Sequence, residues 1–345
     1  MKTLQFFLIV IMSIFTLHNS HAQKIEYSVE KVWGDGTWHC AFTSIVEFKG
    51  RYYISFREYD SHIFNSKGDA EGRIRIISSK NGKKWQSVAL ISKEGYDLRD
   101  PKLSVTPDNR LMVTVGGSIY RNKVLVGCEP HVIFSDDGKV YSEPTPIRLD
   151  PTTKGTHDWL WRVTWHESVA YGVSYSKKEN NKWELYLYKG TDGINYDLVS
   201  HLDCDGFPNE TTVRFLEDGR MALLIRRDNG DRRNIWATSA APFTDWTMTK
   251  SASHMGGPDF IVLGKDKIVA GGRTTFMGAP QTTLFTGNDA GRFIEKITLP
   301  SAGDNSYPGF LRVGDELWVS YYSCHETERP SIYLAKIPLN VFGIE

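Results

Sequence analysis

The stretch SDDGKVY, Ser135 to Tyr141, consists of serine, any residue, aspartate, glycine, two further residues and an aromatic ring. The same form returns in SKNGKKW (79–85), with asparagine for aspartate, and in GTDGINY (190–196), which lacks only the serine. SAAPFTDW (239–246) and TGNDAGRF (286–293) are looser copies. The copies begin at residues 79, 135, 190, 239 and 286, which are 56, 55, 49 and 47 residues apart. A period near fifty predicts a repeat architecture.

Short strands separated by polar turns surround these copies, and no long helical periodicity interrupts them. Clear examples are SIVEFKGRYYISFRE (44–58), LSVTPDNRLMVTVGG (103–117) and FLRVGDELWVSYYS (310–323). One four-stranded blade per repeat fits this period, and about 323 residues after residue 22 give roughly six blades. We therefore predict an all-β fold, a six-bladed β-propeller. The copies are expected to be turns, in which Asp or Asn caps backbone N–H groups and Gly takes the unusual dihedral.

The two ends of the chain carry separate signals. Residues 1–22 have a positive start, an apolar run from Leu4 to Leu17 and a small-residue cleavage site, which predicts a signal peptide. We therefore expect a periplasmic or secreted protein, with residues 23–345 forming a single catalytic propeller domain. The last repeat has no turn copy, so the segment KIEYSVEKVW (24–33) is expected to close the ring as an extra strand.

Composition excludes several kinds of partner. Lys plus Arg and Asp plus Glu both number 41, so a nucleic acid or an anionic membrane surface is not expected to be the ligand. No segment after the signal peptide is apolar enough to span a membrane. The four cysteines are far apart, which allows a disulfide but does not indicate a pairing. No metal-ligand spacing stands out, so neither a metal nor a cofactor is expected.

One predicted hairpin carries an acid and a base at the same end. In GFPNETTVRFLEDGRMALLIRRD (206–228), Glu210 begins one strand and Arg226 ends the next. Strands paired across the turn at 217–219 bring these ends together. Arg227 should point to the other side of its strand and form a structural ion pair, with Asp228 or Asp231.

The turn copies resemble the bacterial neuraminidase repeat, and the chain is similar to sialidase-superfamily propellers over nearly all of residues 23–345. NETTVRFLEDGRMALLIRR, GGRTT (271–275) and NSYPGFLRVGDELWVSYY resemble, in order, the segments that carry a glutamate, two arginines and a tyrosine in that superfamily. The resemblance implies that Tyr307 is the nucleophile and Glu210 its proton acceptor. It implies that Arg226 and Arg273 bind the carboxylate of the sugar.

The residue types suit that chemistry. A sugar with a carboxylate on its anomeric carbon repels a carboxylate nucleophile but not a neutral tyrosine, whose proton a glutamate can take. Arginine binds a carboxylate in a bidentate manner. An aspartate is needed to protonate the leaving oxygen. By position Asp69 matches best, and Asp60 and Asp100 are further candidates.

The first blade departs from the sialidase pattern. Members of the sialidase superfamily carry an arginine in an F/Y-R-I-P segment of the first blade, whereas this chain has Phe42, in HCAFTSIVEF (39–48), at the corresponding position. Arg57 in SFREYDSH or Arg99 in DLRDPKL could supply the missing charge. A terminal sugar other than sialic acid is therefore possible.

Two further groups are candidates for the site. His39 and His62 flank the first strand pair and could act as acid or base near neutral pH. Trp161, in HDWLWRVTW (157–165), could stack on a sugar ring or lie in the core. The sequence thus favours an exported exo-glycosidase of sialidase type that acts on a glycan. A lyase or neutral-sugar glycosidase using His39 or His62, and a non-catalytic carbohydrate-binding propeller, are the alternatives.

Overall fold

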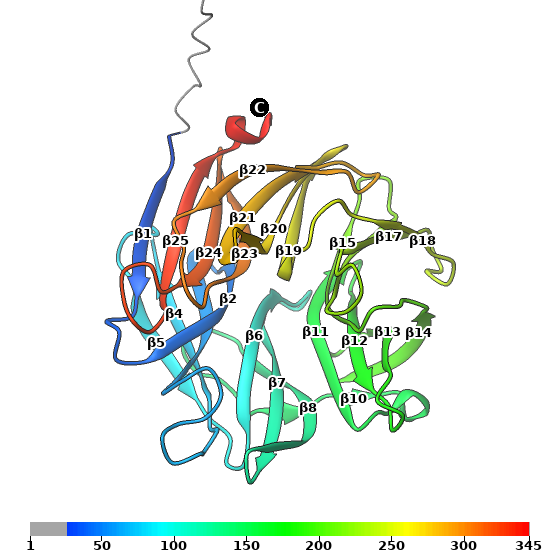
Figure 1. Cartoon of the computed structure of the whole chain (residues 1–345), viewed down its shortest axis with the longest axis horizontal. Helices are drawn as coiled ribbons and strands as arrows, with labels where there is room; N and C mark the ends of the chain where they lie inside the picture. Colours follow the sequence, from blue (N-terminus) through cyan, green and yellow to red (C-terminus); the bar gives the residue numbers. More distant parts are fainter. Residues whose placement is uncertain (1–25, 345) are drawn as a thin grey trace, which may run out of the picture.

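The computed structural model describes residues 26–344, and the predicted signal peptide lies outside these residues. The strands form five hydrogen-bonded sheets, one of which spans two blades, and the resulting six blades are arranged around a central axis (Figure 1). This confirms the predicted six-bladed propeller. Blade 1 consists of β2 (His39–Phe48), β3 (Arg51–Tyr59), β4 (Arg73–Ser79) and β5 (Gln86–Ile91). Blade 2 consists of β6 (Asp97–Val105), β7 (Leu111–Arg121), β8 (Val124–Ser135) and the short β9 (Thr145–Pro146). Blade 3 consists of β11 (His157–His166), β12 (Val169–Lys177), β13 (Trp183–Gly190) and β14 (Asn195–Leu202).

Blades 4 to 6 have the same plan. Blade 4 consists of β15 (Pro208–Phe215), β16 (Met221–Arg227), β17 (Ile235–Ser239) and β18 (Thr247–Lys250). Blade 5 consists of β19 (Gly256–Gly264), β20 (Lys267–Phe276), β21 (Ala279–Gly287) and β22 (Phe293–Leu299). Blade 6 consists of β23 (Ser306–Val313), β24 (Glu316–Ser323), β25 (Ser331–Pro338) and β1 (Ser28–Trp33). The two-residue β10 (Arg148–Leu149) adds to the edge of blade 3. A single pair, His157 with Cys128, connects blades 2 and 3 into a continuous sheet.

The ring closes with a strand from the beginning of the chain. β1 pairs with β25 in antiparallel register, from Ser28 opposite Lys336 to Trp33 opposite Ile332. The sequence-based expectation that the N-terminal segment completes the last blade is therefore confirmed. The consequence is that the first and last parts of the described chain are held in one sheet.

The hydrophobic core is divided among the contacts between neighbouring blades. One cluster joins blades 1 and 2 through Tyr53, Ile76 and Val113, for example, and another joins blades 5 and 6 through Leu284 and Val319. Four further clusters join the remaining pairs of blades. Burial of these apolar faces stabilises the ring, because no blade can cover both of its faces alone.

The repeated turns make contacts between neighbouring blades. At Ser135–Tyr141, Ser135 Oγ accepts a hydrogen bond from Gly138 N (2.9 Å), and Asp137 Oδ1 accepts one from Lys139 N (2.8 Å). Gly138 has a φ of 71° and lies against Tyr53 of blade 1, where an added Cβ would be 2.1 Å from the tyrosine Oη. Glycine is required here both for the backbone angle and for the close approach.

Every inner strand contains a bulge near its beginning. In blade 1, Ala41 pairs with Arg57 and Ser44 with Ser55, so three steps along β2 match two steps along β3. The corresponding shifts occur in all six blades, at residues 42–43, 100–101, 161–162, 209–210, 257–258 and 307–308. A bulge redirects the side chain that it carries. The six bulges therefore determine which side chains face the central axis at the end of the propeller where the bulges lie.

Two simpler observations complete the fold. No helix in the described part of the chain is long and apolar enough to cross a membrane. All four cysteines are free thiols in the structure of residues 26–344.

Candidate active site

The bulges bring side chains from distant parts of the sequence into contact at the axis. The ring centroids of Phe42 and Tyr307 are 5.0 Å apart, and those of Trp161 and Tyr307 are 5.9 Å apart. Tyr307 also contacts Glu210, whose other carboxylate oxygen accepts a hydrogen bond from Gly257 N (2.9 Å). Bulge residues of blades 1, 3, 4, 5 and 6 thus form one connected cluster, with Tyr307 in the middle.

Tyr307 and Glu210 make the central polar contact. Tyr307 Oη donates to Glu210 Oε1 at 2.6 Å, and Arg226 Nη1 lies 2.6 Å from Glu210 Oε2 and donates to Tyr307 Oη at 3.2 Å. Burial, followed by the Glu210 carboxylate, raises the pKa of Tyr307 well above its usual value, although Arg226 acts in the opposite direction. The phenol is therefore neutral at rest and has a carboxylate ready to accept its proton.

The hairpin of blade 4 explains why Arg226 and Arg227 differ. The two side chains leave opposite faces of β16, as neighbouring strand residues do. Arg226 faces the axis and also binds Asp228 (Nη2 to Oδ1, 3.0 Å). Arg227 is buried away from the axis and binds Asp205 (2.9 Å) and Asp231, which agrees with the structural role expected for it.

Arg273 reaches the same cluster from β20. Its guanidinium lies 5.4 Å from the centre of the Tyr307 ring, and Nη2 donates to Tyr322 Oη (2.7 Å) and Asp304 Oδ1 (3.1 Å). Asp304 was not among the residues predicted from the sequence. It lies in the loop before β23 and neutralises part of the charge that Arg273 could offer to an anion.

The position of the missing arginine is filled by aromatic packing. Phe42 has a φ of 67° and packs edge-on against Tyr307, Tyr322 and His62. The Arg99 guanidinium lies 5.1 Å from the centre of the Phe42 ring, so Arg99 is the cation that reaches this position. Its Nη1 donates to His62 O (2.9 Å) and to Asp97 Oδ2 (3.0 Å).

Arg57, the other predicted substitute, has a different place. Its side chain is fully buried and paired with Asp97 (Nη2 to Oδ1, 2.8 Å), and its Nη1 donates to Ser61 O. A guanidinium that is buried in this way cannot meet a ligand at the axis. The structure therefore gives Arg57 a supporting role, because Asp97 joins it to Arg99.

The three acid/base candidates differ sharply in position. Asp100 occupies the bulge of blade 2, is buried, and its Oδ1 has no hydrogen-bond partner among the described residues. Burial raises the pKa of Asp100 to about 6, while Lys102 and Arg99 oppose this and Glu210 adds to it. Asp69 is exposed in the loop after β3, where its carboxylate contacts Asn65. Asp60 lies half-buried directly after β3 and makes no hydrogen bond within residues 26–344.

His39 and His62 come together at Asp304. His39 Nε2 lies 2.9 Å and His62 Nδ1 lies 2.7 Å from the same oxygen, Asp304 Oδ2. His39 is buried and His62 is exposed, and the two rings are 5.4 Å apart. Burial lowers the pKa of His39, and Asp304 opposes that effect. Both histidines therefore belong to the rim of the site, and the acid that orients them is one that sequence spacing did not reveal.

Trp161 lies beneath the site and does not form one of its walls. It is 1% exposed, and Lys102 Nζ lies 4.6 Å from the centre of its ring and 5.7 Å from the centre of the Tyr307 ring. Of the two positions that the sequence allowed for Trp161, stacking on a sugar ring or lying in the core, the structure shows the core position. Lys102 was not predicted as part of the site. Burial lowers the pKa of Lys102 to about 7.

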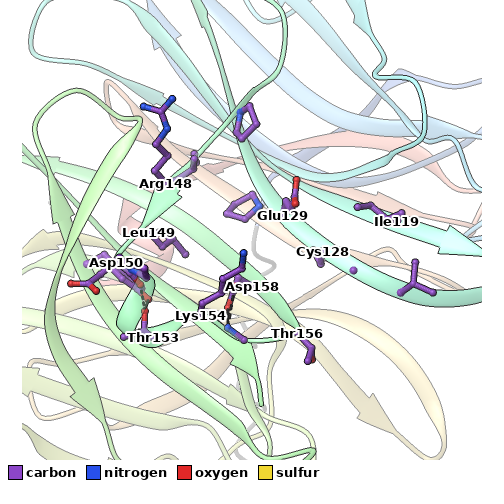
Figure 2. Close-up of a pocket in the computed structure, with 18 residues that line it drawn as sticks. Ile119, Cys128, Glu129, Arg148, Leu149, Asp150, Thr153, Lys154, Thr156 and Asp158 are labelled. Atoms are coloured by element: carbon purple, nitrogen blue, oxygen red, sulfur yellow. Dashed lines mark hydrogen bonds between the residues drawn. The ribbon is translucent and has the colours of Figure 1, made fainter. Parts of the chain in front are cut away.

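A separate cavity of about 680 Å³ lies between blades 2 and 3. Figure 2 shows Cys128 and Glu129 from β8 on one side and Asp158 from β11, with the 150–156 loop, on the other. None of its lining residues belongs to the Tyr307 cluster. The cavity is therefore distinct from the candidate active site.

Fold and cluster together define the class of this protein, which is a propeller with the sialidase-like fold. A protein of unknown function from Dyadobacter fermentans is similar over 90% of this chain and 99% of its own, with 17% identity and a TM-score of 0.76. Trypanosoma rangeli sialidase is similar over 92% of this chain, with 12% identity and a TM-score of 0.72. The NanB sialidase from Streptococcus pneumoniae is also similar over 92% of it, with 12% identity and a TM-score of 0.68.

These likenesses concern the fold. The chain spans 60% of the length of the Trypanosoma rangeli enzyme and 71% of that of NanB. No protein-family model and no curated protein sequence matches it. The Trypanosoma rangeli sialidase has been solved with sialic acid and, with 2,3-difluorosialic acid, as a covalent intermediate.

Proposed function

We propose that this protein is an exported glycoside hydrolase that removes a terminal acidic sugar, similar to sialic acid, from glycans. The observation that carries this proposal is the short contact between Tyr307 and Glu210, supported by Arg226, at the centre of a sialidase-like propeller. The N-terminal segment 1–22 supports export to the periplasm or outside the cell.

In the proposed reaction, Tyr307 Oη attacks the anomeric carbon while Glu210 accepts the phenolic proton. The glycosidic bond breaks, and an acid donates a proton to the leaving oxygen. Water then attacks the anomeric carbon and breaks the glycosyl–tyrosine bond. It gives one proton to the carboxylate left by the acid, and Glu210 returns its proton to the tyrosine oxygen. The neutral phenol suits a substrate with a carboxylate at the reacting carbon, because an anionic nucleophile would be repelled.

We assign the acid/base role to Asp100 in place of Asp69. Asp100 lies at the same level of the propeller as Tyr307 and Glu210 and interacts electrostatically with both. Asp69 makes its contacts within an exposed loop. The raised pKa of Asp100, about 6, keeps a fraction of this carboxyl protonated in mildly acidic solution, as a general acid requires.

The test is hydrolysis of a fluorogenic sialoside by the natural protein and by Tyr307→Phe. We expect kcat to fall by roughly 10³-fold or more in the variant, because the nucleophile is lost. Tyr333→Phe is the matched control: its hydroxyl, in the outer part of the same blade, contacts Glu326, and activity should be unchanged. Full activity in Tyr307→Phe would exclude the tyrosine mechanism.

A second measurement detects the intermediate directly. 2,3-Difluorosialic acid should add its glycosyl mass to the protein, and peptide mapping should place the adduct on Tyr307. Glycan binding without any turnover over a broad panel of substrates would instead indicate a carbohydrate-binding propeller.

A further inference from the structure

Three donor atoms meet at the rim of the site from segments that are far apart in the chain. His39 lies at the beginning of β2, His62 in the loop after β3, and Asp304 in the loop before β23. One ligand atom from each residue lies within 4.8 Å of the other two, and Asp304 Oδ2 is 2.9 Å and 2.7 Å from the two imidazole nitrogens. The three residues come together because blades 1 and 6 are neighbours in the closed ring.

Two imidazoles and one carboxylate are a donor set that suits a divalent transition metal ion. Bonds of about 2.0–2.1 Å in a tetrahedral site place donor atoms roughly 3.4 Å apart, so a zinc ion needs only a small separation of these side chains. Ca²⁺ and Mg²⁺ prefer oxygen ligands and fit this set poorly.

The surroundings hold the carboxylate in the orientation that such a site needs. Asp304 Oδ1 accepts hydrogen bonds from Arg273 Nη2 (3.1 Å) and Tyr322 Oη (3.0 Å), which leaves Oδ2 directed at the histidines. Partners of this kind orient metal ligands in known sites. The His62 side chain is 46% exposed and that of Asp304 is 26% exposed, so solvent or a substrate group can occupy the remaining coordination positions.

The location of the three residues gives the ion a role. The His62 ring packs against Phe42 (5.4 Å between ring centroids), and Phe42 stands where a sialidase carries its first arginine. Arg273, on the other side of Asp304, has its charge balanced by that carboxylate. A divalent ion would leave this part of the site with a net charge of about +2, counting Arg273 and Asp304. Arg99 reaches the Phe42 ring, but it is buried and already paired with Asp97, so it is not included.

We propose that His39, His62 and Asp304 bind a divalent cation of the zinc type, and that the ion supplies the positive charge that Phe42 cannot. The metal site stands on its own geometry. Its role in binding the anionic group of the sugar rests on the proposed function.

The first experiment measures zinc bound to untagged protein after equilibrium dialysis, by elemental mass spectrometry. We expect about one zinc ion per chain in the natural protein, and a loss of at least about tenfold in zinc affinity in His62→Ala and Asp304→Asn. His201→Ala, which removes an exposed histidine of blade 3, is the control and should bind zinc normally. Equal zinc binding by the natural protein, His62→Ala and Asp304→Asn would overturn the metal site.

The second experiment tests the role without turnover, by calorimetry with DANA, an inhibitor bound in the Trypanosoma rangeli sialidase. Zinc should tighten its binding to the natural protein and have no effect on His62→Ala. Equal affinity with and without zinc would overturn the role. Zinc binding without sialoside hydrolysis would support the metal site and reject the proposed function. Sialoside hydrolysis without zinc binding would support the proposed function and reject the metal site.

Discussion

Neighbouring residues of one strand have opposite tasks in blade 4. Arg227 is buried, donates to Arg233 O (2.8 Å) and binds Asp205 and Asp231, so it holds the loop after β16. Arg227→Ala should lower the free energy of unfolding by roughly 1–3 kcal/mol, measured in urea, because buried packing and an ion-pair network are lost together. Arg220→Ala, which breaks an exposed pair with Asp218, should change it by less than about 1 kcal/mol.

Arg226 should show the reverse behaviour. Arg226→Lys keeps a positive charge near Glu210 but loses the planar group that reaches Glu210 and Asp228 together. We expect near-native stability and at least about tenfold lower kcat/KM on a sialoside. If Arg226→Lys unfolds more easily than Arg227→Ala and keeps the native kcat/KM, this division of roles is contradicted.

Asp100 should couple stability and activity to pH. Its pKa is raised by burial to about 6, against about 3.9 in an unfolded chain, so its ionisation costs stability as the pH rises through about 6. Asp100→Asn should therefore be more stable than the natural protein at pH 8, by up to about 3 kcal/mol, and similar to it at pH 4.

The same variant should lose activity. If Asp100 is the acid, kcat should fall by about 10²–10⁴-fold in Asp100→Asn, and in the natural protein activity should decline as the pH rises above about 6. Asp69→Asn should leave both properties unchanged. Loss of activity in Asp69→Asn alone would return the acid role to the loop after β3.

At the scale of the element, the repeated turn stabilises its own backbone and also packs against the neighbouring blade. Gly138→Ala should destabilise the protein by roughly 2–4 kcal/mol, because φ is 71° and the new methyl group would collide with Tyr53. Gly219→Ala has the same kind of backbone angle, 83°, but nothing within 4 Å, and should cost only about 1–2 kcal/mol. Thermal unfolding of the two variants compares these effects, and equal losses would show that the contact between blades contributes nothing.

The bulges are the element that sequence reasoning missed. Three of them carry proline as the second residue, in RDPKLSV, GGPDFIVL and SYPGFLRV, and proline is tolerated there because a bulge leaves its position outside the regular ladder. This second repeat would have placed Asp100, Gly257 and Tyr307 at equivalent positions. It would thereby have favoured Asp100 over Asp69.

For the whole molecule, closure of the ring by β1 is the decisive feature. A chain that begins at Gly34 lacks β1 and leaves the edge of β25 unpaired. Compared with a chain that begins at Gln23, its Tm should be at least about 5 °C lower, by circular dichroism. Light scattering should show aggregation through the open edge. An unchanged Tm would mean that the six blades hold together without this strand.

The sequence by itself determined the propeller, the number of blades and the pairing of Glu210 with Arg226. These follow from turn spacing and from hairpins, in which residues close in the chain decide the structure. It also indicated Tyr307 and Arg273, through a resemblance in order. Only the tertiary structure decided that Arg99 lies on Phe42, that Trp161 is buried, and that Asp304 joins His39 to His62. These contacts join neighbouring blades through residues that are as many as 265 positions apart in the chain, and their geometry depends on bulges and on ring closure, which no local pattern specifies.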